Sequence, residues 1–106
     1  MQSRDLDHNA CDHRDEFPGE WAISVWSAPD LDVDALTKAS PIRNRQICVT
    51  TVGALREIGH DVVPSNEFPH ADLKLDADPS EALWEQLRQV FGTPTDNPNP
   101  YRRQGR

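Results

Sequence analysis

The sequence predicts an α+β fold, a two-layer sandwich of helices against a mixed sheet of about four strands. Two segments carry this prediction. Residues 71–75 alternate between apolar and polar side chains, the pattern of a strand with one buried and one solvated face. Residues 79–91 carry apolar side chains at helical spacing and therefore form an amphipathic helix that covers another apolar surface. The predicted order of elements is β-α-β-α-β-β-α, with the helices mainly on one face of the sheet.

The length of the chain allows a single domain, and both ends are poor in side chains that could join its core. Residues 1–16 are rich in charged side chains, and residues 93–106 contain three prolines and end in a weakly basic stretch. Neither segment buries enough apolar surface to offset the entropy lost on ordering. We expect a disordered N-terminal tail at 1–16, an α+β domain at 17–92 and a proline-rich C-terminal tail at 93–106.

The first strand is expected at residues 20–27, where the side chains of alternate residues point to opposite faces. This alternation places Trp21 on one face and Trp26 on the other, which favours a central strand covered on both faces. A helix follows, for which Asp30 is the candidate N-cap and Pro41 prevents continuation.

A second strand is expected at residues 46–51, which are rich in β-branched side chains. The connection between the first two strands has the length of a helical crossover, so the two strands are expected to pair in parallel. A short helix at residues 52–58 ends before Gly59, which suits the left-handed conformation at a helix end. Residues 61–64 form a brief third strand that ends at Pro64.

The closing helix has the clearest boundaries in the chain. Asp78 is its candidate N-cap, Pro79 suits the first helical position, and Glu81 completes a capping box. Gly92 ends the helix. Its apolar stripe consists of Leu83, Trp84, Leu87, Val90 and Phe91.

The formal net charge of −7, from 11 basic and 18 acidic side chains, argues against nucleic acid as a partner, because phosphate binding requires a basic surface. The chain contains no apolar run of the ~18 residues that a membrane span requires, and its N-terminus lacks the apolar core of a signal peptide. Cys11 lies in the expected N-terminal tail and Cys48 in the expected second strand, so a disulfide between them is not expected. Two free thiols suit the reducing cytoplasm. The sequence leaves the oligomeric state open.

The most metal-like group of side chains lies in the N-terminal segment. His8, Cys11 and His13 offer the nitrogen and sulfur donors that zinc prefers. However, all three donors lie within one short segment, whereas structural zinc sites usually take pairs of ligands from two separated segments. We therefore predict no metal site here, and no cofactor for the chain.

A second group of polar side chains supports an enzymatic interpretation with a phosphate-containing substrate. The turn at residues 50–53 leads into a helix N-terminus, whose free N–H groups can hold an anion, and a nearby histidine could donate a proton. An ordinary helix cap and a solvated strand face explain these residues more simply. If the chain is an enzyme, His60 and His70 should lie in one pocket with Thr50 and Thr51. The candidates are His60, His70 and Thr51 for catalysis, Thr50 for binding, and Arg43 and Arg45 for holding the phosphate charge.

The sequence favours an interaction or accessory module over an enzyme. If one face of the sheet is left open by the helices, Trp26 could anchor a protein partner there. The acidity of the chain suits a partner with a basic surface, as for an antitoxin-like or immunity-like protein. The alternative is a small enzyme or toxin-like effector that acts on a phosphate-containing substrate.

Overall fold

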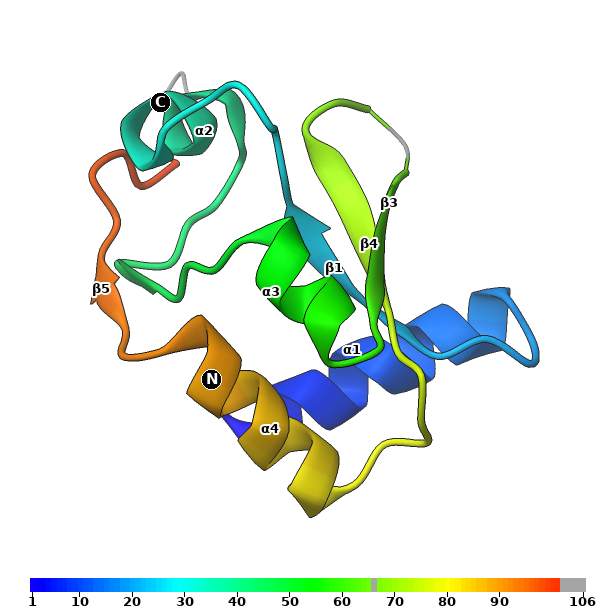
Figure 1. The fold of residues 1–106 in the computed structure, drawn as a ribbon. Coiled ribbons are helices and arrows are strands. Elements are labelled where there is room, and N and C mark those ends of the chain that lie inside the picture. The colour runs from blue at the N-terminus through cyan, green and yellow to red at the C-terminus, as the bar shows by residue number, and fades with distance from the viewer. Residues whose placement is uncertain (66, 102–106) are drawn as a thin grey trace.

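The computed structural model describes residues 1–65 and 67–101 and confirms the α+β class (Figure 1). The predicted order β-α-β-α-β-β-α is also confirmed, preceded by one further helix and followed by one further short strand. The elements are α1 (Ser3–Glu16), β1 (Ala22–Trp26), α2 (Val33–Ala39), β2 (Gln46–Ile47), α3 (Val52–Glu57), β3 (Asp61–Pro64), β4 (His70–Lys74), α4 (Glu81–Phe91) and β5 (Thr95–Asp96).

The main sheet contains β1, β4 and β3 in that order, and both pairings are antiparallel. Ile23 and Val62 both lie opposite Leu73, which places the central strand's apolar side chains between those of its neighbours. β2 pairs instead with β5, so the predicted parallel pairing of the first two strands is wrong. The predicted central position of β1 is also wrong, because β1 lies at the edge of the sheet and β4 at its centre.

Polar groups of the chain itself occupy both edges of the main sheet. Backbone N–H groups of an antiparallel strand point alternately toward and away from its neighbour. On the outer side of β1, the Ser24 N–H donates to Asn9 Oδ1 of α1 (3.0 Å). On the outer side of β3, the Val62 N–H donates to Asp61 Oδ1 (2.8 Å), and Pro64 has no N–H to offer. Such edges disfavour pairing with a strand of another chain.

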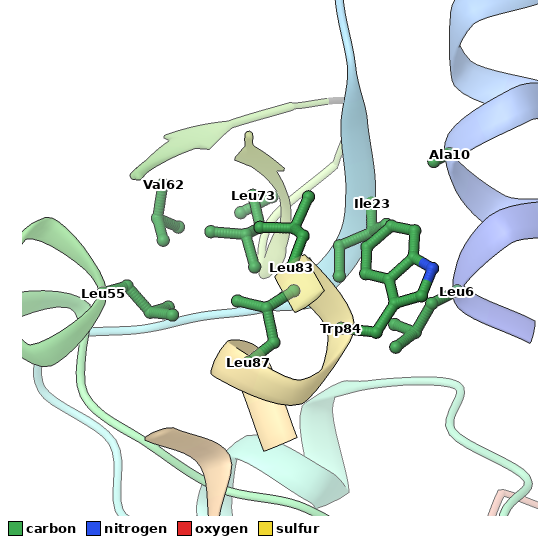
Figure 2. Close-up of a cluster of buried hydrophobic side chains, with 10 residues drawn as sticks. Leu6, Ala10, Ile23, Leu55, Val62, Leu73, Leu83, Trp84 and Leu87 are labelled. Atoms are coloured by element: carbon green, nitrogen blue, oxygen red, sulfur yellow. The ribbon is translucent and has the colours of Figure 1, made fainter. Parts of the chain in front are cut away.

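The core lies between the apolar face of the sheet and the helices α1, α3 and α4 (Figure 2). Its largest fully buried side chains are Trp84, Leu73 and Leu87. The indole of Trp84 also donates from Nε1 to Asp7 Oδ1 (2.8 Å), so the largest fully buried side chain of α4 is bonded to α1. The buried apolar residues of this cluster are Leu6, Ala10, Ile23, Leu55, Val62, Ala71, Leu73, Leu83, Trp84 and Leu87.

The segment predicted to be a disordered N-terminal tail, residues 1–16, contains helix α1 in the structure. Leu6 and Ala10 are four residues apart, so they share one face of the helix and both enter the core. Polar contacts hold the start of the helix on α4, where Ser3 Oγ donates to Glu81 Oε1 (2.7 Å). The apolar face of α1 is too narrow for the sequence to predict a buried helix, because most of the other side chains of α1 are charged.

Two predicted helix caps are displaced by two residues. Asp32, not Asp30, caps α2 by accepting from the amide three residues later (2.8 Å). Ser80, not Asp78, caps α4 in the same way (3.1 Å), so the proline between them lies outside the helix. Asp78 accepts instead from Trp21 Nε1 (2.9 Å). The predicted helix ends were otherwise close, with positive φ at Gly59 and Gly92, as expected for residues that follow a helix.

Part of the predicted C-terminal tail is bound to the body of the protein. Asn97 is 6% exposed, and its Nδ2 donates to two carbonyls of the 42–44 segment (3.3 and 3.0 Å). Asn99 Nδ2 donates to the carbonyl and carboxylate oxygens of Asp34 in α2 (3.1 and 3.0 Å). Residues 102–106, which the tail prediction also covers, lie outside the described residues.

We expect Asn97→Ala to lower the free energy of unfolding by about 1–3 kcal/mol, because it removes two hydrogen bonds and leaves the Asn44 carbonyl without this donor. The Ile42 carbonyl still accepts from the Tyr101 N–H (2.7 Å). Chemical denaturation followed by circular dichroism measures the change. The matched control is Asp96→Ala at the exposed neighbouring position, which should change stability by less than about 0.5 kcal/mol. Equal stability of the two variants would show that the segment is not anchored through Asn97.

Candidate functional site

An apolar cleft of about 820 Å³ lies between the main sheet, α2 and the beginning of α3. It is within the size range of ligand and anchor pockets. Its wall includes the segment that leads from β1 to α2 and the segment between β2 and α3. Its apolar lining includes Trp26, Leu31, Val33, Leu36, Val49, Val52, Phe68 and Ala71.

The cleft gathers apolar side chains that the core does not cover. The buried core cluster includes no residue of α2, whose Val33 and Leu36 line the cleft instead. Five large apolar residues of the described chain are exposed, and three of them line this cleft: Val33 at 37%, Val49 at 46% and Phe68 at 71%. Exposed apolar surface concentrated in one hollow is typical of a binding site.

A second hollow, of about 410 Å³, lies between α1 and the polar face of the main sheet. We call it the acidic groove, because four carboxylates line it and neither lysine nor arginine is among its described lining residues. Its other polar side chains include three histidines. The charged and titratable lining residues are Asp5, His8, Asp12, His13, Glu16, His70 and Asp72.

The two hollows meet at the end of the β3–β4 hairpin. Ser65 and His70 line both of them. His70 Nδ1 donates to the carbonyl oxygen of Ser65 (3.2 Å), which holds the ring between the two hollows. Trp26 packs against the same ring in an edge-on arrangement, with centroids 5.0 Å apart. The cleft and the groove therefore adjoin at this end of the sheet.

An ion-pair network lies beside the acidic groove. Glu20 accepts from Lys74 Nζ (2.8 Å) and lies 2.7 Å from His13 Nε2, so it links β4 to α1. The hydrogen bond from Lys74, with a further one from His13, lowers the pKa of the Glu20 carboxyl. The same contact with Glu20 raises the pKa of Lys74.

These shifts predict how stability depends on pH. The Glu20 pKa is depressed in the folded state, so its contribution is fully present above the ordinary glutamate value and is lost as pH falls through the folded pKa. Glu20→Gln should therefore flatten the acid side of the stability curve, measured as melting temperature between about pH 6 and pH 3. Glu57→Gln on the exposed surface of α3 is the control and should leave the wild-type slope. An unchanged slope in Glu20→Gln would show that the network contributes nothing.

Four of the residues singled out from the sequence lie at the cleft: Trp26, Thr50, Thr51 and His70. His60 is not among them. It is 4% exposed and accepts from the Asp76 N–H at Nδ1 (3.1 Å), while its Nε2 lies 3.1 Å from Gln86 Oε1. These bonds connect the turn between α3 and β3 to the segment after β4 and to α4, which gives His60 a structural position.

The convergence of both histidines that the enzymatic interpretation requires is therefore not found. Thr51 caps α3 by accepting from the amide three residues later (3.1 Å). Arg43 and Arg45 line neither the cleft nor the groove. Arg43 lies above the ring of Tyr101 instead, with its guanidinium carbon 6.0 Å from the ring centroid.

The metal candidates His8, Cys11 and His13 are all on α1, and the helix separates them. His8 Nε2 lies 3.3 Å from Asp12, whereas His13 is bound to Glu20. Helical geometry turns position 13 by about 200° from position 11, so these two donors point to nearly opposite sides. Among residues 1–65 and 67–101, no group of three or more histidine, cysteine or acidic side chains is arranged to hold a metal ion.

Two features of the site were not predicted from the sequence. One is the contribution of Val49 and Phe68, which lie in connecting segments where a single apolar residue carries no periodic signal. The other is the acidic groove, because its carboxylates come partly from α1, which the sequence does not predict. The alternation of β4 was a usable signal, since it placed His70 and Asp72 together on the polar face.

No protein-family model, no curated protein and no solved structure matches this chain. Within the described part of the chain, the helices are all too short or too polar to cross a bilayer.

Proposed function

We propose that this protein is an interaction module that binds a partner protein through the apolar cleft. The observation that carries the proposal is the concentration of exposed Val33, Val49 and Phe68 around one hollow, beside the half-buried Trp26. Aromatic side chains at the centre of a water-excluding apolar patch are the residue types that dominate binding energy at protein interfaces.

The charge of the chain supports a partner with a basic surface. The net charge is −7, and Arg56, the one lysine or arginine among the described lining residues of the cleft, is bound to Asp61 (2.8 Å). Opposite charge steers association and discriminates against other acidic proteins. An accessory protein that masks a basic surface, in the manner of an antitoxin or immunity protein, fits these properties.

The two cysteines support a cytoplasmic setting for this interaction. Cys11 and Cys48 are both free thiols, and Cys11 is exposed. Unpaired thiols are typical of proteins in reducing compartments. We therefore propose that the partner is met in the cytoplasm.

Capture of the partner from host extract with a tagged chain tests the proposal. The cleft variant carries Val33→Ser and Val49→Ser, both at exposed positions that the fold does not need buried. The control is Tyr101→Ser, an equally exposed aromatic that does not line the cleft. We expect a stoichiometric protein that wild type and control retain and that the cleft variant loses. Equal capture by all three forms would show that the cleft is not the binding site.

A further inference from the structure

The apolar cleft and the acidic groove are two chemically different hollows that share the Ser65–His70 edge. A partner segment that continued from the cleft past His70 would meet the carboxylates of the acidic groove. The chemistry of the second hollow adds information about the partner that the cleft alone does not give.

We infer that the partner segment is basic and amphipathic, with a bulky apolar side chain in the cleft and a lysine or arginine side chain in the acidic groove. The inference rests on the proposed interaction function and specifies the chemistry of its partner. A single polypeptide segment can occupy both hollows, because they adjoin at His70.

The carboxylates of the groove are available for such a cation. Among the described residues, Glu16 and Asp72 form no salt bridge and accept no side-chain hydrogen bond, and Asp12 is paired only with the exposed His8. A guanidinium or ammonium group between α1 and β4 would meet carboxylates from both sides. Charge-assisted hydrogen bonds of this kind are stronger than neutral ones.

The geometry also favours a side chain with an apolar stem. Phe17 is 48% exposed and lines the acidic groove, where its ring packs on His13 with centroids 4.9 Å apart. The methylene groups of lysine or arginine can pack along an aromatic face while the charged end reaches carboxylates. A free inorganic cation would make no use of that ring.

Three synthetic peptides of the same length test the inference. The first carries leucine and phenylalanine flanked by lysine and arginine, the second replaces the apolar residues with serine, and the third replaces the basic residues with glutamate. Binding is followed in ¹H–¹⁵N spectra through the three tryptophan indole signals. We expect only the first peptide to bind and to move the Trp26 signal, while Trp84, which is 1% exposed, stays unchanged.

Two pairs of substitutions locate the contacts. Glu16→Gln with Asp72→Asn in the groove should weaken binding of the first peptide by about tenfold and reduce its salt dependence. Val33→Ser with Val49→Ser in the cleft should weaken binding by a similar factor without changing the salt dependence. Tyr101→Ser should bind as wild type.

The outcomes separate this inference from the proposed function. If the glutamate peptide binds as tightly as the basic one, or if no peptide binds, the inference is overturned. The proposed function would still stand if the cleft variant loses the partner captured from extract. If that capture does not depend on the cleft, the proposed function fails, whatever the peptides do.

Discussion

Trp84→Ala should remove a large part of the stability of this protein. The side chain is 1% exposed and lies on the α1 side of the core, near Leu6 of α1 and Ile23 of β1 (Figure 2). Removing a large buried aromatic costs about 3–5 kcal/mol, and a domain of this size is stable by only about 5–15 kcal/mol. Urea denaturation followed by circular dichroism measures the loss. The substitution also leaves Asp7 without the indole donor that joins α4 to α1.

Two further tryptophan variants serve as comparisons for Trp84→Ala. Trp84→Phe keeps much of the apolar volume but loses the hydrogen bond to Asp7, so its loss should be intermediate. Trp26→Ala changes a half-buried side chain at the cleft and should cost less than half as much as Trp84→Ala. Equal losses for Trp26→Ala and Trp84→Ala would contradict the position assigned to the core.

Deletion of residues 1–16 should leave a protein that does not fold stably. The deletion removes Leu6 and Ala10 from the core and uncovers the outer side of β1, where Asn9 now bonds the Ser24 N–H. An uncovered edge strand next to exposed apolar surface promotes aggregation. Size-exclusion chromatography and circular dichroism of the truncated chain measure the outcome.

Single substitutions in α1 test its contribution to stability without truncating the chain. Leu6→Ala should cost about 2–4 kcal/mol, because it opens a cavity beside Trp84. His8→Ala, on the exposed side of α1, should change stability by less than about 0.5 kcal/mol. A truncated chain that keeps the wild-type melting temperature would show that residues 1–16 are a tail after all.

Elements whose side-chain pattern is local and regular were predictable from the sequence. The alternation along β4 follows directly from its position at the centre of an antiparallel sheet with one face on the core. α4 was predicted because its apolar stripe is wide, with Leu83, Trp84 and Leu87 all buried. In both cases the residues that fix the element also pack in the core, so the signal in the sequence is strong.

The segments at both ends were not predictable, because distant polar contacts hold them. α1 contributes only Leu6 and Ala10 to the core, and the sequence gives no sign that Asp7 accepts from an indole 77 residues away. Asn97 resembles an ordinary loop residue, and only the fold brings its amide to the carbonyls of residues 42–44. The composition of a segment indicates how much apolar surface it can bury, but it does not predict specific hydrogen bonds to distant residues.

Only part of the candidate site was predictable from the sequence. Trp26 and the turn at Thr50 and Thr51 do lie at one hollow, because strand ends and helix N-termini meet there. His60 looked equally available in sequence, but burial against α4 makes it a structural residue. Exposed apolar residues such as Val49 become informative only when the fold places them beside others.

Hydrogen exchange of the captured complex, compared with that of the free protein, shows whether a partner binds at the apolar cleft. We predict that partner binding slows amide exchange in residues 27–36 and 49–52, which form two walls of the cleft, and leaves α4 unchanged. Slower exchange confined to α4 or to residues 95–101, with none at the cleft, would contradict this prediction.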